Sequence, residues 1–163
     1  MPDAKRLYEE DFAAWSKNQA DALRAAARSG SNLRLDWENL AEEIEVWGNR
    51  RRGACAQISF ESSNIFVKLE HSPAIDPRNC WRRSIRVARL QIGSILEDNP
   101  SLRGEVGRLV GAATRDGIEL AILWLEEHGE IDATDYARLR RSSYTPDQVL
   151  GDWFPPEPPR EER

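Results

Sequence analysis

Three glutamates belong to the densest group of carboxylates in this 163-residue chain. Glu38, Glu42 and Glu45 stand at positions i, i+4 and i+7, so a helix would present all three on one face, with Glu43 beside them. Carboxylate oxygens are the ligands that hard cations such as Mg²⁺ prefer. The spacing therefore makes this carboxylate face a candidate cation site.

A magnesium site of this kind needs a second pair of acidic residues. All-α nucleotide pyrophosphohydrolases hold magnesium with an E-x-x-E helix and a following E-x-x-D helix, and Glu42 and Glu45 fit the first pattern. The nearest second pattern is Glu61-x-x-Asn64, with asparagine in place of aspartate. On one continuous helix Glu45 and Glu61 would be about 24 Å apart, too far to share an ion. A magnesium-dependent nucleotide hydrolase therefore requires a break in that helix; otherwise the face is solvated or salt-bridged.

Five arginines form the second candidate group, a basic face made of Arg78, Arg82, Arg83, Arg86 and Arg89. With Trp81 among them, they could bind phosphates and stack on a base. The alternative is that they pair with carboxylates of a neighbouring helix and that Trp81 belongs to the core. A formal net charge of −5 disfavours nucleic acid as a partner.

Histidines and cysteines are few and scattered. His71 and His128 are too far apart in the sequence to predict a metal or acid–base site, and Cys55 and Cys80 would not face each other across a helical hairpin. A zinc site would need paired spacing that is absent here, and neither a glycine-rich phosphate loop nor a nucleophile elbow is present. We expect no cofactor, and a non-enzymatic protein is the favoured interpretation.

The helix that carries the carboxylates is predicted to be the longest. Asp36 suits its N-cap, because a carboxylate there accepts hydrogen bonds from free backbone N–H groups. Apolar residues then keep a 3-4-3 spacing at Trp37, Leu40, Ile44 and Trp47. The phase continues to about residue 70, although Gly48 and Gly53 each cost roughly 1 kcal/mol relative to alanine in a helix. One unbroken helix over 37–70 is favoured over two helices that break between the glycines.

The same periodicity predicts helices over residues 8–26, 80–98 and 100–128. Gly30 and Gly129 suit the left-handed position that often follows a helix. A short charged helix over 132–141 is expected next, and Thr145 and Gln148 match a capping box.

Two expectations concern packing. Gly104, Gly107 and Gly111 lie close together in the helix over 100–128, where small residues would let a neighbouring backbone approach or mark a bend. Trp153 and Phe154 are expected to fold back onto the core, since a free tail would gain nothing from two aromatic side chains.

These elements predict an all-α protein, a single-domain helical bundle with two long helices and shorter flanking helices. The helical domain covers residues 1–154, and a flexible tail rich in Pro, Glu and Arg covers residues 155–163. No apolar run approaches the roughly 20 residues of a membrane helix, and the N-terminal residues lack the apolar centre of a signal peptide. We therefore expect a cytoplasmic protein with no membrane partner.

The order of several motifs resembles that of the bacterial domain-of-unknown-function family 29. The motifs are YEEDFAAW (8–15), LDWENLAEEIE (35–45) followed by Gly48, WRRSIRVARLQ (81–91), NPSL (99–102) and YTPDQVL (144–150). The resemblance implies an all-helical cytosolic bacterial protein without an established activity, and it supplies no catalytic residues. Family members often carry a histidine shortly before the lysine that Lys68 matches, and residues 64–67 contain none here.

The favoured function is a non-enzymatic helical interaction module that binds a protein partner or itself as a homodimer. Trp37, Trp47 and Trp81 are assigned to core or interface packing, where aromatic side chains bury the most area. The first alternative is a phosphate- or nucleic-acid-binding protein that uses the basic face from Arg78 to Arg89. The second is the magnesium-dependent hydrolase that uses Glu42 and Glu45.

Overall fold

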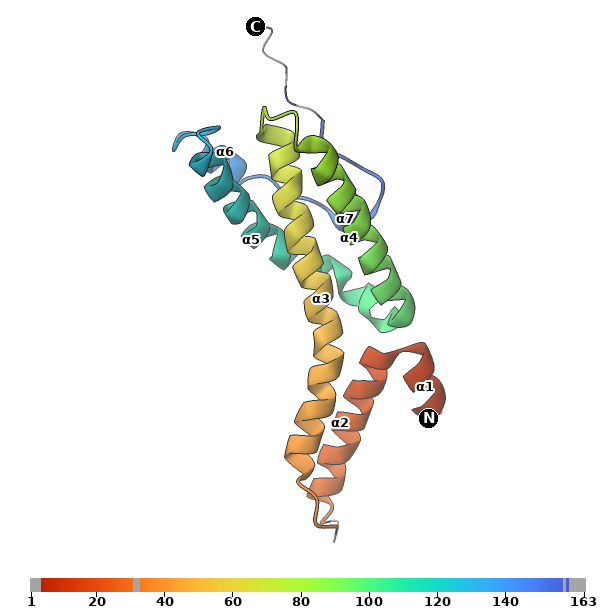
Figure 1. The fold of residues 1–163 in the computed structure, drawn as a ribbon. Coiled ribbons are helices and arrows are strands. Elements are labelled where there is room, and N and C mark those ends of the chain that lie inside the picture. The colour runs from red at the N-terminus through yellow and green to blue at the C-terminus, as the bar shows by residue number, and fades with distance from the viewer. Residues whose placement is uncertain (1–3, 31–32, 157, 159–163) are drawn as a thin grey trace, which may run out of the picture. The chain divides into compact units, whose positions relative to one another are not determined.

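The computed structural model describes residues 4–30, 33–156 and 158, and these form helices and no strand (Figure 1). The elements are α1 (Ala4–Glu10), α2 (Phe12–Arg28), α3 (Trp37–His71), α4 (Arg78–Asp98), the 3₁₀ helix η1 (Pro100–Glu105), α5 (Val106–Glu127), α6 (Tyr136–Leu139) and α7 (Pro146–Leu150). The predicted all-α fold with long helices and shorter flanking ones is confirmed. No helix in the described ranges is both long enough and apolar enough to span a membrane.

The chain divides into two compact units. Unit 1 comprises Met1–Ala54 and Ser94–Glu105, and unit 2 comprises Cys55–Gly93 and Val106–Arg163. Helices α3 and α4 each contribute residues to both units. The expectation of one domain over 1–154 and a tail over 155–163 stays a prediction, and residues 157 and 159–163 lie outside the described part of the chain.

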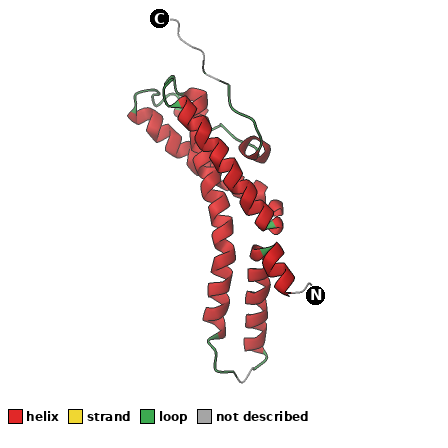
Figure 2. Cartoon of the chain, turned by 45° about the vertical axis from the view of Figure 1, so that its right-hand side comes forward, coloured by secondary structure: helices red, strands yellow, loops and turns green. Residues whose placement is uncertain are grey.

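Unit 1 is built on an antiparallel hairpin of α2 and the first half of α3, which lie side by side in Figures 1 and 2. The single helix predicted over 8–26 is wrong, because α1 ends before Asp11 and α2 begins after it. The Asp11 Oδ1 accepts a hydrogen bond from the Ala14 N–H at 2.9 Å. Such a carboxylate satisfies a free N–H group in the first turn and thereby favours a new helix start.

Small residues fill the seam between α2 and α3. Ala13, Ala20 and Ala41 have no exposed surface. A β-carbon added at Gly48 would lie 2.0 Å from the Ser16 Oγ. A side chain at position 48 would therefore have to displace the Ser16 hydroxyl from the seam.

Helix α3 continues through Gly48 and Gly53 without a break, as its periodicity predicted. Asp36 caps it, since the Asn39 N–H donates to the Asp36 Oδ1 at 3.3 Å. Its buried line in unit 1 passes through Ala41 and Gly48. The apolar 3-4-3 stripe from Trp37 to Trp47 therefore lies beside the seam instead of within it.

Buried polar contacts join the start of α2 to the turn between α4 and η1. The Asp11 carboxylate accepts hydrogen bonds from the Ser101 N–H at 2.6 Å and the Ser101 hydroxyl at 2.9 Å. The fully buried Asn99 accepts from the Ala13 N–H at 3.0 Å and donates to the Ile95 carbonyl at 2.8 Å. The helix predicted from residue 100 begins here as η1, and α5 follows it.

Unit 2 packs the second half of α3 closely against α5. A β-carbon at Gly117 would lie 2.5 Å from the Phe60 carbonyl oxygen. Beside this crossing, the hydroxyls of Ser63 and Thr114 are 3.1 Å apart and share a hydrogen bond. The close approach of a neighbouring backbone, which was expected at Gly104, Gly107 or Gly111, therefore occurs at Gly117. At Gly104 and Gly111, no neighbouring atom lies within 4 Å of the point that a β-carbon would occupy.

The C-terminal segment of unit 2 folds back as predicted. Thr145 and Gln148 form a complete capping box at α7. The Trp153 ring meets the buried Phe66 ring edge-on at 5.5 Å between centroids. The charged helix predicted over 132–141 is shorter than expected, because only Tyr136–Leu139 is helical.

Candidate functional site

One side of the unit 1 hairpin carries an apolar stripe from each helix. We call these residues the hairpin face: Phe12, Trp15 and Leu23 of α2, and Trp37, Leu40, Ile44 and Trp47 of α3. Leu40 is 41% exposed and Trp47 is 56% exposed, while the other five are half-buried. Large apolar side chains at this exposure are unusual when they occur as a continuous stripe.

Helix geometry places both stripes on the same side of the seam. At 3.6 residues per turn, each stripe lies roughly 70–90° from the buried line of its own helix, in the same rotational sense. Similar rotations on antiparallel helices lead to the same side. The opposite side is charged, since the Arg24 guanidinium of α2 lies 2.7 Å from the Glu45 carboxylate and 3.9 Å from the Glu38 carboxylate of α3.

Helix α1 covers one end of the hairpin face. The Tyr8 ring meets the rings of Phe12 and Trp15 edge-on, at 5.6 and 4.8 Å between centroids. Phe12 and Trp15 stack on each other at 5.4 Å. This aromatic group fixes the rings of α2, whereas Trp47 of α3 keeps more than half of its surface exposed.

The structure places Glu38, Glu42 and Glu45 of the predicted carboxylate face on the charged side of the hairpin, whereas Glu43 flanks the hairpin face. Hydrogen bonding to Glu45 raises the pKa of Arg24 further above its usual range. Glu42 and Glu43 are exposed. No three His, Cys, Asp or Glu side chains within the described ranges are grouped so that they could hold a metal ion. The helix break that the magnesium hydrolase required is absent from α3.

The structure organises the predicted basic face around the C-terminal segment. The Arg89 guanidinium donates hydrogen bonds to the carbonyls of Gln148 at 2.9 Å, Val149 at 3.0 Å and Trp153. Burial lowers the pKa of Arg89 from its usual range. The guanidinium carbons of Arg82, Arg86 and Arg89 lie 5.5, 5.8 and 4.8 Å from the centre of the Phe154 ring.

The two remaining members of the basic face differ from these three. Arg78 is buried and donates to the carbonyls of Leu69 and Ser72, so it closes the C-terminal end of α3. Arg83 is exposed. The predicted face therefore consists of one buried helix cap, three arginines around an aromatic ring, of which Arg86 is exposed, and the exposed Arg83.

Comparison with known proteins gives a family and a fold. The family model described as Domain of unknown function DUF29 matches residues 7–154. The chain belongs to this family. A search of curated proteins found no match. The chain is also similar to an alpha-helical protein of unknown function from Rhodospirillum rubrum, with a TM-score of 0.68, 23% identity and 89% of each chain covered.

In this DUF29 chain, Lys68 lies in an aromatic cluster that sequence spacing did not reveal. Its ammonium is 4.5 Å from the centre of the Trp124 ring. Trp124 also stacks on His128 at 3.9 Å and meets Trp81 edge-on at 5.7 Å. Burial lowers the pKa of the Lys68 amine. Trp81 is thus half-buried in packing, as the sequence predicted.

A second titratable group joins the end of α3 to the segment before α7. The buried Tyr144 hydroxyl donates a hydrogen bond to the Glu70 carboxylate at 3.0 Å, and burial raises the pKa of Tyr144 above its usual range. The His71 Nε2 lies 3.9 Å from the same carboxylate, and burial lowers the pKa of His71. No local spacing links residues 70 and 144, so the sequence alone could not have paired them.

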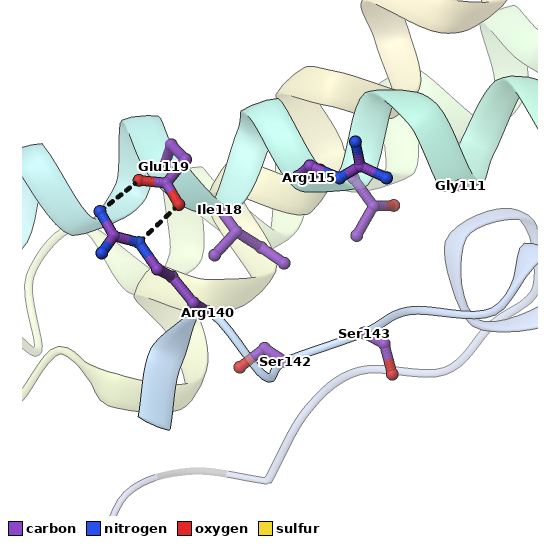
Figure 3. Close-up of a pocket in the computed structure, with 8 residues that line it drawn as sticks. Gly111, Arg115, Ile118, Glu119, Arg140, Ser142 and Ser143 are labelled. Atoms are coloured by element: carbon purple, nitrogen blue, oxygen red, sulfur yellow. Dashed lines mark hydrogen bonds and ion pairs between the residues drawn. The ribbon is translucent and has the colours of Figure 1, made fainter. Parts of the chain in front are cut away.

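A small pocket lies between α5 and the segment over 140–143 (Figure 3). Its volume is about 190 Å³, below the roughly 300–1,000 Å³ of typical ligand pockets. The Arg140 guanidinium forms two parallel bonds to the Glu119 carboxylate at its edge, at 2.7 and 2.9 Å. This pairing lowers the pKa of Glu119, so the two charges at the edge already satisfy each other.

Proposed function

We propose that this DUF29 chain is a non-enzymatic helical interaction module that binds a protein partner through the hairpin face. The observation that carries the proposal is the exposure of Leu40 and Trp47 within a continuous apolar stripe. Exposed apolar patches with polar rims are typical of protein–protein contact sites. Tryptophan is also among the residues that contribute most binding free energy at such sites.

The rim of the hairpin face favours a protein partner over a lipid surface. Asp36 at the start of α3, Glu43 and Arg50 within it, and Asn18 of α2 flank the stripe and are exposed. Membrane-surface helices carry mainly Lys and Arg around their apolar side, since lipid headgroups are anionic. A rim with both signs of charge is suited to a protein surface, where opposite charges can be matched.

Photo-crosslinking in the cell tests this function. A photoreactive phenylalanine analogue at Leu40 reports on the hairpin face, and the same analogue at Glu42 is the matched control on the charged side of α3. We expect light-dependent adducts from position 40 that are absent from position 42 and lost when Ile44→Asp is added. Equal crosslinking at both positions would contradict the proposal.

Phosphate binding by the basic face is the second candidate function. It is favoured by the exposure of Arg83 and Arg86 on α4. Binding of single-stranded nucleic acid or of a polyphosphate should weaken with salt and with Arg83→Ala combined with Arg86→Ala. Binding that neither salt nor the double substitution changes would remove this candidate.

A further inference from the structure

We infer that the partner of the hairpin face is a second copy of this chain, bound about a two-fold axis so that the two α3 helices pack antiparallel. The inference rests on the proposed function and names its partner. In such a dimer the same surface is used by both copies. Each two-helix hairpin would supply half of a four-helix arrangement, in which apolar stripes from both copies meet in the centre.

The spacing of the stripe on α3 is self-complementary. Trp37, Leu40, Ile44 and Trp47 follow one another at steps of three, four and three, and this order reads the same in both directions. An antiparallel pairing of two such stripes therefore brings Trp37 opposite Trp47 and Leu40 opposite Ile44, twice over. Apolar residues at alternating steps of three and four are the pattern of helices that pack lengthwise.

The charges at the edge of the stripe fit the same arrangement. Asp36 and Arg50 stand seven residues before and after Glu43, so each is about 10 Å from it along the helix. An antiparallel pairing centred near Glu43 brings Asp36 of one copy close to Arg50 of the second copy, and the reverse. Opposite charges at positions that flank an apolar seam set the pairing and direction of helices.

The apolar stripe and the charged pair of Asp36 and Arg50 predict nearly the same position for the two-fold axis along α3. The stripe from Trp37 to Trp47 is centred on residue 42, and the charged pair is centred on residue 43, a difference of about 1.5 Å along the helix. The pairing has one unfavourable contact, since the two Glu43 side chains approach each other near the axis. Like charges at neighbouring positions are destabilising. Removing the charge of Glu43 should therefore strengthen this dimer.

The size of the face predicts a reversible dimer. Helix α2 has 17 residues and is therefore about 25 Å long, and two adjacent helices are about 20 Å wide. Because α1 covers one end of the face, the free area is at most roughly 500 Å² on each copy, or about 1,000 Å² in total, which does not exceed the lower limit for a stable specific interface. We therefore expect a monomer–dimer equilibrium that depends on protein concentration.

Sedimentation equilibrium of the full chain over a wide concentration range tests the dimer. Trp47→Arg should weaken association by more than about a hundredfold, because the substitution removes an apolar anchor from both copies. Trp47 is more than half exposed, so the variant should keep its helical content and melting temperature. A monomer at every concentration, or a dimer that Trp47→Arg does not weaken, would overturn the inference.

Two neighbouring glutamates give a matched test of the arrangement. Glu43→Gln should tighten association about twofold to fivefold, because it removes the repulsion near the axis. Glu42→Gln makes the same chemical change on the charged side and should leave association unchanged. Arg50→Glu should weaken association, since it brings a carboxylate at position 50 of one copy close to Asp36 of the second copy, at both ends of the paired stripes. Equal effects of Glu43→Gln and Glu42→Gln would overturn the antiparallel pairing.

The crosslinking and sedimentation results separate the two proposals. Adducts from position 40 with twice the mass of the chain support both the interaction module and the second copy. Position-dependent adducts of another mass, together with a monomer in sedimentation, keep the interaction module and overturn the second copy. No adduct at position 40 above the control, together with a monomer, overturns both.

Discussion

Gly117 of α5 lies directly against the backbone of Phe60 on α3, so that a β-carbon at position 117 would be 2.5 Å from the Phe60 carbonyl oxygen. The contact atom belongs to a helix backbone, which cannot rotate away as a side chain can. The spacing between the two helices is therefore fixed by the absence of a side chain at Gly117.

Gly117→Ala should destabilise the protein by about 1–3 kcal/mol, because the helices must move apart to admit the methyl group. Gly111→Ala, earlier on the same helix, is the matched control. No neighbouring atom lies within 4 Å of its β-carbon position, so it should stabilise the protein by up to about 1 kcal/mol through helix propensity. Urea unfolding monitored by circular dichroism measures both changes; a stabilised Gly117→Ala would contradict the packing described here.

Gly48 and Gly53 of α3 make a second matched pair. Gly48→Ala should be destabilising, since its β-carbon would meet the Ser16 hydroxyl, while Gly53→Ala has open space and should stabilise by about 1 kcal/mol. The nearest obstacle is one oxygen atom, which also donates to the Ala13 carbonyl at 3.0 Å. Ser16→Ala combined with Gly48→Ala should therefore recover part of the loss. Thermal unfolding of these three variants and of Ser16→Ala alone gives the comparison. If the double variant loses as much stability as the two single variants together, the contact between the two positions is contradicted.

Lysine should not be able to replace Arg89 without a loss of stability. Its planar guanidinium donates to three carbonyls of the C-terminal segment, and an ammonium cannot reproduce this geometry. Arg89→Lys should cost about 1–3 kcal/mol, since partly buried carbonyls lose their partners. Arg83→Lys, on the exposed part of the same helix, should be neutral. Near-ultraviolet circular dichroism, with a Trp153→Phe variant to identify the Trp153 contribution among six tryptophans, would show whether the segment loosens. Equal stability of Arg89→Lys and Arg83→Lys would refute the role of Arg89.

His71 should make stability depend on pH. Burial lowers its pKa below the usual 6.5 in the folded protein, so the unfolded chain binds the proton more readily. The contribution to stability is therefore present above pH 6.5 and is lost as the pH falls below it. His71→Gln should flatten the fall of the urea midpoint below about pH 6.5. His128→Gln, at an exposed position just after α5, is the control, and an unchanged slope in His71→Gln would contradict this assignment.

Local signals in the sequence predicted local structure well. Gly30 and Gly129 adopt positive φ angles of 76° and 66°, as their positions after helices required. The Thr145 and Gln148 capping box is complete. The continuous helical spacing of apolar residues correctly predicted that α3 runs unbroken through Gly48 and Gly53. Each of these features depends on residues within a few positions of one another, which is why the sequence alone determines it.

Features that depend on distant residues could not be derived in this way. Gly111 and Gly117 of α5 look alike in the sequence, and the position of Phe60 on α3 distinguishes them. The partners of Arg89 follow it by 59 residues or more. Periodicity identified the stripe from Trp37 to Trp47, but it did not show that α2 covers the neighbouring line through Ala41 and Gly48. The start of α2 after Asp11 did have a local signal, because aspartate before an apolar residue is a common helix N-cap. The aromatic residues, however, keep helical spacing across Asp11, and this spacing predicted one continuous helix over 8–26.

The contact between Asp11 and Ser101 spans 90 residues of sequence, and this separation affects how the protein is made. A ribosome completes both helices of the hairpin long before it reaches Ser101, so α2 and α3 can pair while α2 still lacks its contacts with the turn before η1. During that interval the hairpin is stabilised by its own α2–α3 contacts alone, because the hydrogen bonds that Ser101 and Asn99 make with the start of α2 cannot yet form.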